Sequence, residues 1–441
     1  MRNPEIEKAE RGVIDSYQLQ HLKNTVNKVL MVSPFYRERF AELQVDSSKL
    51  RNIADLQILP FTTKTDLRGH YPFGFMAVEK HRLSRIHASS GTTGKPTIIG
   101  YTKNDINYWA DIIARAILTA TGLDSGLIHN AYGYGLFTGG LGLHHGAEKL
   151  GMTVIPASAG NTERQITLIE DLKPDILCAT PSYALNIAEK MIEMGKSPQQ
   201  TSLRFGIFGA EPWSEEMRQK LEELFQIKAC DIYGLSEVIG PGVAVECHEA
   251  QDGLHVAEDH FIIEVINPVT KKPLPEGEEG ELVFTSIKKE AFPIIRYRTG
   301  DIASITRNKC SCGRTTARMS RIKGRMDDML IIRGVNVYPS EIELCLLKLQ
   351  ELTPHYQLDI TNQGPTQEIT LNVEINDSVY QKTSRNLEHH EIKQISSKLK
   401  EKLKSACLIS IEVNILAPKT LPRSQGKTVR VVDKRKTESL M

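Results

Sequence analysis

The feature that most constrains the fold is an alternation of β-branched runs with amphipathic segments between Arg85 and about Tyr233. Apolar spacing predicts helices and strands that follow one another over residues 162–171, 176–179, 181–195 and 203–208. Strands that alternate with helices favour parallel sheets whose faces are covered by helices. The sequence therefore predicts an α/β fold for this part of the chain.

Other segments have different patterns. Residues 1–75 read as helical, and residues 255–305 change to strands and turns that predict a small β-barrel-like subdomain. After Arg325 the composition changes again, to a compact α+β unit. Because 441 residues exceed one ordinary domain, we predict a large N-terminal domain over residues 1–326 and a small C-terminal domain over residues 327–441.

Charge and composition exclude several classes of partner. The chain has 55 Lys and Arg against 54 Asp and Glu, a net charge of +1, so no general attraction to nucleic acid or to an anionic membrane is expected. The N-terminal segment MRNPEIEKAE lacks an apolar signal core, and no apolar run approaches the ~20 residues that span a bilayer. We expect a cytoplasmic protein with reduced cysteines.

The segment SSGTTGKPT, residues 89–97, has the composition of a phosphate-binding loop. Glycines let the backbone N–H groups approach phosphate oxygens, hydroxyls add donors and the lysine adds positive charge. It is not a Walker loop, because two residues separate its glycines and a proline follows the lysine. Its flanks, RIHASS and TIIGYT, read as two strands that the segment joins. A flexible connector has a similar composition. The candidate phosphate ligands are Ser89, Ser90, Gly91, Thr92, Thr93, Gly94 and Lys95.

A second candidate site consists of cysteine and histidine. Cys310 and Cys312 form a C-x-C knuckle, and Cys247 and His255 lie at the start of the same β-rich segment. A Cys3His set suits tetrahedral Zn2+ in a structural role, because all four coordination positions are filled. His248 is an alternative ligand, and three reduced cysteines without metal are the alternative interpretation.

Several motifs together resemble one superfamily. In chain order they are HASSGTTGKPT, AYGYGLFTGGLG, FGAEPWSE, DIYGLSEV, RYRTGD, DDMLIIRGVNVYPS and RSQGK. Their sequence and order resemble the adenylate-forming enzymes, and most closely the phenylacetate-coenzyme A ligase branch, from about Phe35 to the last few residues. The resemblance implies a large adenylating domain and a small mobile domain, with ATP, Mg2+ and CoA as cofactors and an aryl carboxylic acid as substrate.

The resemblance also implies roles for individual residues. Glu237 is the expected Mg2+ ligand, and Tyr233 is expected to stack on adenine with its hydroxyl near the phosphates. Lys427 is expected to bridge the carboxylate and the α-phosphate during adenylation. Further nucleotide contacts are expected from Lys64, Gly209, Ala210, Glu211, Pro212, Asp231, Gly234, Asp301 and Arg325.

In this superfamily an acyl-adenylate forms first, and the acyl group is then transferred to CoA. The resemblance implies a hinge and a path for CoA in that second step. Asp327 matches the hinge position, while Gly334 and Val335 are expected to line the pantetheine tunnel. The acid is expected to lie among Tyr134, Phe137, Ala210 and Ile239. RYRTGD carries a glycine at position 300, where the phenylacetate branch often has arginine.

These patterns predict an AMP-forming ligase that converts phenylacetate, or a close aryl acid, with ATP and CoA to the acyl-CoA through an acyl-adenylate. The alternative is a stand-alone adenylating enzyme that passes another aryl acid to CoA or to a carrier protein. An ATP-binding regulator is a third class. The sequence leaves the oligomeric state open, a homodimer included.

The role of Lys427 gives the first testable prediction. If the lysine acts only while the carboxylate attacks ATP, Lys427→Ala abolishes acid-dependent ATP–pyrophosphate exchange. Thioester formation from supplied acyl-adenylate and CoA should remain close to that of the unaltered enzyme. Comparable loss in the two assays would contradict the assignment.

Overall fold

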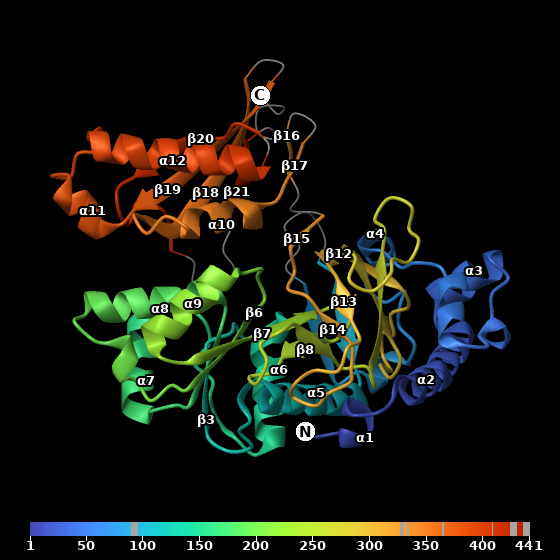
Figure 1. The fold of residues 1–441 in the computed structure, drawn as a ribbon. Helices are drawn as coiled ribbons and strands as arrows, with labels where there is room; N and C mark the ends of the chain where they lie inside the picture. The colour runs from blue at the N-terminus through green and yellow to red at the C-terminus, as the bar shows by residue number, and fades with distance from the viewer. Residues whose placement is uncertain are drawn as a thin grey trace.

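The computed structural model describes residues 1–89, 96–326, 330–332, 335–363, 366–407, 409–423 and 430–434. A large body contains the elements from α1 to β15, and a smaller one contains those from β16 to β21 (Figure 1). This arrangement confirms the predicted fold class of a large α/β part with a small C-terminal α+β domain. The predicted boundary at residues 326 and 327 stays a prediction, since residues 327–329 lie outside the described chain.

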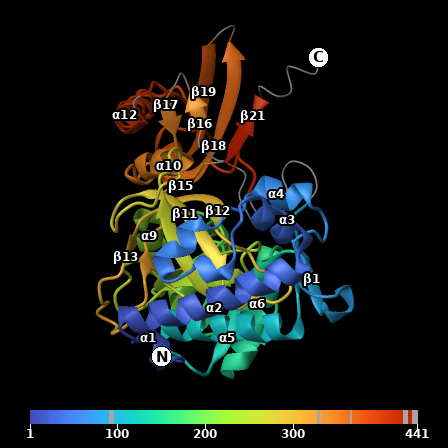
Figure 2. The same cartoon turned by 90° about the vertical axis from the view of Figure 1, so that its right-hand side faces the viewer.

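The N-terminal segment is helical, as predicted. Three short 3-10 helices, Ser47–Lys49, Ile53–Ile58 and Lys80–Arg82, accompany its α-helices. The α-helices are α1 (Pro4–Glu7), α2 (Arg11–Val32), α3 (Pro34–Glu42) and α4 (Lys64–Gly69). Leu22, Val26 and Val29 of α2 are fully buried, because they recur on one face of the helix. Figure 2 shows α2 along the outer side of the large body.

The alternating segment forms one nine-stranded sheet with the order β13-β14-β9-β8-β7-β6-β5-β3-β4. The run from β4 to β7 is parallel, as the alternation predicts, and the remaining pairs are antiparallel. The strands are β3 (Leu127–Asn130), β4 (Thr153–Ile155), β5 (Ile176–Ala179), β6 (Phe205–Gly209), β7 (Lys228–Leu235), β8 (Gly240–Glu246), β9 (Leu254–Val256), β13 (Ile305–Thr306) and β14 (Arg318–Met319).

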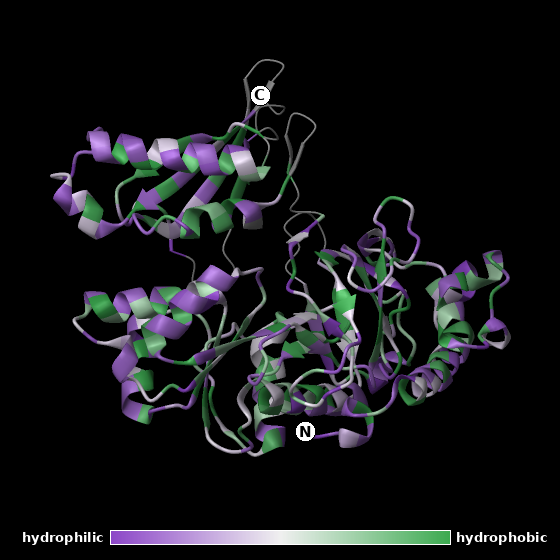
Figure 3. Ribbon diagram, in the orientation of Figure 1, coloured by the Kyte–Doolittle hydropathy of each residue, from purple (hydrophilic) through white to green (hydrophobic). Residues whose placement is uncertain are grey.

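Helices pack against this sheet through apolar faces. They are α5 (Lys103–Thr121), α6 (Thr138–Leu150), α7 (Thr162–Leu172), α8 (Pro181–Glu193) and α9 (Glu215–Phe225), with a 3-10 turn at Pro198–Gln200. On α9, the Ser214 side chain accepts the N–H of Met217 at the N-terminus, and Met217, Leu221 and Phe225 are buried. Figure 3 shows the alternation of hydrophilic and hydrophobic bands along α9.

The β-rich segment supplies a second sheet, which is antiparallel and has the order β10-β11-β12-β15. Its strands are β10 (Phe261–Ile266), β11 (Gly280–Ser286), β12 (Tyr297–Ala303) and β15 (Gly324–Arg325). A separate hairpin pairs β1 (Arg85–Ala88) with β2 (Ile98–Tyr101). Its strands flank residues 89–97, as predicted for the two ends of the phosphate-binding segment.

The small body has its own core. Its four-stranded sheet has the order β20-β19-β18-β21, and Leu358, Leu371, Leu399 and Leu403 are fully buried in it. Its elements are β16 (Leu330–Ile332), β17 (Val335–Val337), α10 (Pro339–Leu347), β18 (Leu352–Gln363), β19 (Thr366–Ile375), α11 (Asp377–Lys382), α12 (His390–Cys407), β20 (Glu412–Leu416) and β21 (Val431–Asp433). Within the described ranges, no helix combines the length and the hydropathy that a membrane span requires.

Two ion pairs join the small body to α8 of the large one. Nε2 of His355 lies 2.8 Å from Oε2 of Glu189, and Nζ of Lys419 lies 2.7 Å from Oε1 of Glu193. In Figure 1, α10 lies above α9 on the same side. The acidic C-terminal part of α8 therefore contacts the small domain in this arrangement.

Candidate active site and metal centre

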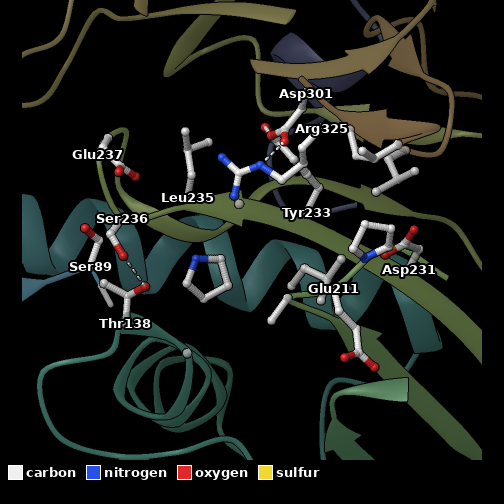
Figure 4. Close-up of a pocket in the computed structure, with 18 of the residues that line it drawn as sticks. Ser89, Thr138, Glu211, Asp231, Tyr233, Leu235, Ser236, Glu237, Asp301 and Arg325 are labelled. Carbon is white, nitrogen blue, oxygen red and sulfur yellow. Dashed lines mark hydrogen bonds and ion pairs between the residues drawn. The ribbon is translucent and has the colours of Figure 1, made fainter. Parts of the chain in front are cut away.

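One pocket of the large domain brings together most of the residues expected to bind the nucleotide (Figure 4). Its walls come from the turn after β6, from β7 with the turn that follows, and from the paired strands β12 and β15. The predicted residues that line it are Lys64, Ser89, Ala210, Glu211, Pro212, Asp231, Tyr233, Gly234, Glu237, Asp301 and Arg325. Residues from distant parts of the sequence therefore share one cavity.

The turn after β6 depends on small residues. Gly209 ends the strand, and a Cβ there would lie 2.1 Å from the carbonyl oxygen of Ile232 on neighbouring β7, so a side chain cannot be accommodated. Ala210 follows with a φ of 70°, a left-handed conformation that side chains disfavour. The strained turn keeps the backbone of residues 210–212 at the pocket wall, without bulk that would obstruct a flat base.

A carboxylate and a guanidinium meet at one side of the pocket. Nε of Arg325 lies 3.0 Å from Oδ1 of Asp301, its pairing partner across β12 and β15. The Tyr233 hydroxyl donates a hydrogen bond to Oδ2 of Asp301 at 2.6 Å, and burial together with that carboxylate raises the pKa of the phenol. The tyrosine hydroxyl is therefore held at Asp301, and its expected position near the phosphates stays a prediction. Its ring packs on Phe284.

A second acidic group lies deeper in the pocket. Burial and the neighbouring Glu246 raise the pKa of Asp231, and Glu246 accepts the backbone N–H of Asp231 at 2.8 Å. Arg218 donates to both oxygens of Glu246 at 2.6 Å, so Glu246 has a direct cationic partner. Asp231 consequently favours the neutral carboxyl, which can both donate and accept a hydrogen bond.

Glu237 lies in the turn 236–239 between β7 and β8, with its side chain at the pocket (Figure 4). The residue is only 8% exposed, yet its carboxylate makes no hydrogen bond or ion pair within the described parts of the chain. A partly buried carboxylate without a protein partner fits a hard divalent cation such as Mg2+. The same turn is fixed by Ser236, whose hydroxyl is 3.1 Å from that of Thr138.

Only two of the four residues expected to hold the acid line this pocket. Phe137 and Ala210 line the pocket, whereas Tyr134 and Ile239 are not among its lining residues. The Tyr134 hydroxyl instead accepts a hydrogen bond from Asn130 and contacts His144. Aromatic and apolar surface comes from residues that the sequence did not single out, namely Tyr132, Leu143 and Pro241.

The predicted Cys3His set comes together away from this pocket. The ligand atoms of Cys247, His255, Cys310 and Cys312 all lie within 4.8 Å of one another. The two Sγ atoms of Cys247 and Cys310 are 3.8 Å apart, and Sγ of Cys312 is 3.5 Å from Nε2 of His255. Tetrahedral zinc with Zn–S bonds of about 2.3 Å requires ligand separations of about 3.8 Å, so these residues fit the ion.

The histidine is oriented for this role. Nδ1 of His255 lies 3.3 Å from the hydroxyl of Thr316, which leaves Nε2 directed at the cysteines. Burial and the nearby Arg314 and Arg318 lower the pKa of His255 to about 3, so the ring is neutral. The alternative ligand, His248, instead contacts the carbonyl oxygen of Thr119 and is outside the cluster.

Several predicted residues cannot be placed. Ser90, Gly91, Thr92, Thr93, Gly94, Lys95, Asp327, Gly334 and Lys427 lie outside the described residues. Val335 begins β17, and only its backbone is described.

Other residues at the pocket had no sequence signal. Arg321 lines it and lies over the ring of Trp213, at 5.1 Å from the ring centroid. Lys289 lies behind Glu237, and burial lowers its pKa to about 8 against the opposing effects of Asp105 and Glu237. Lys289 is one of two adjacent lysines in the segment IKKEAF, and nothing in its spacing marks burial.

The fold and the site define the class of this protein. The family model for the AMP-binding enzyme matches residues 42–288, more than half of the chain, and the model for the AMP-binding enzyme C-terminal domain matches residues 334–435. The chain is therefore an AMP-binding enzyme of the adenylate-forming class, as its motifs indicate.

Proteins of similar sequence show to which branch of the adenylate-forming enzymes the chain belongs. Phenylacetate-coenzyme A ligase of Thermus thermophilus is 47% identical over 99% of this chain and 100% of its own length. Phenylacetate-coenzyme A ligase of Escherichia coli is 49% identical over 98% of this chain and 97% of its own length. The chain belongs to the phenylacetate-coenzyme A ligase family.

Solved structures bear on the arrangement of the two domains. A 2-hydroxyisobutyryl-CoA ligase in the postadenylation state, 27% identical, superposes with a TM-score of 0.92 over 99% of this chain and 93% of that one. The same ligase in the thioesterification state gives a TM-score of only 0.72 over the same shares. Since the two states have one sequence, the difference lies in conformation, and this chain has the domain arrangement of the postadenylation state.

Proposed function

We propose that this enzyme joins phenylacetate to CoA in two steps within one pocket. An oxygen of the phenylacetate carboxylate attacks the α-phosphorus of ATP, and pyrophosphate leaves. The sulfur of CoA then attacks the carbonyl carbon of the phenylacetyl-adenylate, and AMP leaves. The observation that carries the proposal is near full-length identity of 47–49% to four phenylacetate-coenzyme A ligases. The pocket supports it with groups for a base, a ribose and a divalent cation.

Different residues of the pocket suit the adenine, the ribose and the phosphates of the nucleotide. The backbone of residues 210–212 and the neutral carboxyl of Asp231 suit the adenine, because a carboxyl can both donate to a ring nitrogen and accept from an amino group. Asp301, fixed by Arg325 and Tyr233, suits the ribose hydroxyls. The phosphates would lie toward Ser89, Lys64 and Glu237, which line the remaining wall.

Glu237 would hold Mg2+. When bound there, the ion would supply positive charge that offsets the negative charge developing on the phosphates. The role of Glu237 is to supply the ligand at a fixed place, and the role of residues 89–95 is to donate hydrogen bonds to the phosphate oxygens.

The small domain would serve both steps in turn. We assign the bridging ammonium of the first step to Lys427, the pivot to Asp327 and the CoA tunnel to Gly334 and Val335. The contacts of His355 and Lys419 with α8 belong to the adenylating arrangement, given its similarity to the postadenylation state. Rotation about the pivot would break them and expose the acyl carbonyl to CoA.

The acid would lie against Phe137, with Tyr132 and Leu143 completing an apolar wall beside the glycines of α6. These side chains would offer an apolar surface for a ring on one methylene.

Substrate preference tests this proposal. In an assay of acid- and CoA-dependent AMP release, we expect kcat/KM for phenylacetate to exceed that for benzoate by about 10-fold or more, because one methylene in an apolar pocket contributes about 1–3 kcal/mol. Long fatty acids should be poorer still. Phe137→Ala should lower kcat/KM for phenylacetate about 10-fold, while Leu136→Ala, an exposed neighbour, should leave it unchanged.

Faster turnover of an alkyl acid would contradict the assignment of phenylacetate. Acid-dependent pyrophosphate exchange without CoA-dependent AMP release would instead support an adenylating enzyme with a carrier protein as acceptor.

We further propose a structural zinc ion at Cys247, His255, Cys310 and Cys312. The distances among the ligand atoms support this, as does the reach of the site: it ties β8 and β9 of the large sheet to the loop before β14. A closed four-ligand site has no open position for a substrate, so the ion would stabilise the lobe without entering the reaction.

The zinc site predicts a measurable stability effect. Protein purified without added metal should contain about one zinc per chain, because structural sites of this type bind tightly. The double variant Cys310→Ser, Cys312→Ser should lose the metal and melt at a lower temperature by a few degrees, since ~2 kcal/mol shifts the melting temperature of a domain of 150–250 residues by about 4–8 °C and that of a larger domain by less. Cys345→Ala, outside the cluster, should retain the zinc. Native protein free of zinc, or an unchanged melting temperature in the double variant, would contradict the proposal.

A further inference from the structure

Two side chains from separate segments, Lys289 and Tyr101, donate hydrogen bonds to the backbone next to Glu237. Nζ of Lys289 donates to the carbonyl oxygen of Val238 at 3.0 Å, with a longer contact of 3.5 Å to that of Glu237. The Tyr101 hydroxyl donates to the carbonyl oxygen of Ile239 at 2.7 Å. Consecutive carbonyl groups of the turn 236–239 are therefore fixed from one side, while the Glu237 carboxylate lies at the pocket.

The donors are packed on one another. The Lys289 ammonium lies 4.9 Å from the centroid of the Tyr101 ring, which stacks on Trp109 at 5.3 Å with an interplanar angle of 17°. Trp109 in turn donates from Nε1 to the carbonyl oxygen of Pro241 at 3.0 Å. Tyr101 and Trp109 are almost fully buried. We call Tyr101, Trp109 and Lys289 the brace.

Lys289 is an unusual member of this cluster. It is only 5% exposed, and the carboxylates of Asp105 and Glu237 are near enough to favour its charged form, although neither makes a close ion pair with it within the described residues. Burial of an ammonium is costly unless it is compensated, and here the compensation is two carbonyl oxygens and an aromatic face. A neutral side chain of similar length would leave the carbonyl oxygens of Glu237 and Val238 without this donor.

The brace also reaches the strands on either side of residues 89–97. Tyr101 ends β2, and the ring of His87 on the paired strand β1 meets those of Tyr101 and Trp109 edge to face at 5.5 and 5.8 Å. The carboxylate of Glu237 and the two ends of the proposed phosphate-binding segment are therefore fixed to one cluster of side chains.

We propose that Lys289 is a positioning residue for the divalent cation of the adenylation step, acting through the backbone of the turn that carries Glu237. The inference rests on the proposed function of Glu237 as the Mg2+ ligand. The ammonium and the Tyr101 hydroxyl fix that turn, so the carboxylate meets the phosphate-bound ion without a conformational search. Residues that orient a metal ligand from behind commonly contribute 10–100-fold to metal affinity.

The test compares Lys289→Met with Lys288→Met, which removes the adjacent lysine that lies over the ring of Tyr17 instead. In Lys289→Met, the Mg2+ concentration for half-maximal ATP–pyrophosphate exchange should rise about 10-fold or more. The affinity for ATP in the presence of Mg2+, measured by calorimetry without acid, should fall by a similar factor, whereas Mg2+-free ATP binding should not change. Thioester formation from supplied phenylacetyl-adenylate needs no metal and should be retained. Lys288→Met should match the unaltered enzyme in every measurement.

Two further variants keep the result interpretable. Lys289→Arg keeps the charge and the hydrogen-bond donors. Its Mg2+ concentration for half-maximal exchange should therefore lie close to that of the unaltered enzyme. Tyr101→Phe removes one hydroxyl with little change of volume, and should raise the Mg2+ requirement by a smaller factor even if Lys289→Met folds poorly. An unchanged Mg2+ requirement in Lys289→Met, or an equal loss in both half reactions and in Mg2+-free ATP binding, would overturn the inference. If the unaltered enzyme shows no acid-dependent ATP–pyrophosphate exchange, the proposed function is wrong. The calorimetric measurement of ATP binding with and without Mg2+ still decides the role of Lys289.

Discussion

The contact on which this site depends is the carboxylate of Asp301 held between the Arg325 guanidinium and the Tyr233 hydroxyl. Each of the three residues lies on a different strand, and the contact joins the large sheet, through β7, to the antiparallel sheet of β12 and β15. β15 is also the last strand before the small domain. One hydrogen-bonded carboxylate therefore joins the two sheets close to the point where the chain enters the small domain. A charged group that is paired and hydrogen-bonded can be kept largely out of water at modest cost.

The large domain is preorganised and the small domain is attached through few contacts. The adenylating pocket lies in the large domain, where the brace, the strained turn at Ala210 and the Asp301 contact fix its walls. The small domain has a separate core, and ion pairs with α8 join it to the large one. Partly exposed ion pairs contribute little free energy each, so the small domain can leave this arrangement without a large barrier. A rigid site with a loosely docked domain would suit two successive reactions of one carboxyl group.

The sequence predicted those features of the fold and the site that depend on short-range patterns of residue type. The alternation of strands and helices, the hairpin around residues 89–97, the small-residue turn at Gly209 and the convergence of Cys247 with Cys310 follow from propensity, spacing and residue type. Features that arise from packing between distant segments were not predictable. Tyr134 was expected in the acid pocket, but Asn130 and His144 hold its hydroxyl elsewhere. Lys289 gave no signal, because its burial depends on β2 and α5, which lie far from it in the chain.

The central claim is that the carboxylate of the acid attacks the α-phosphorus of ATP to give an acyl-adenylate. Phenylacetate labelled with 18O in both carboxylate oxygens tests this directly, with AMP, pyrophosphate and the thioester analysed by mass spectrometry after a single turnover. An acyl-adenylate route transfers one 18O atom to each AMP and leaves one in the thioester carbonyl. Unlabelled AMP, with 18O in pyrophosphate or inorganic phosphate instead, would contradict the account, because the acid would then have attacked a different phosphorus atom.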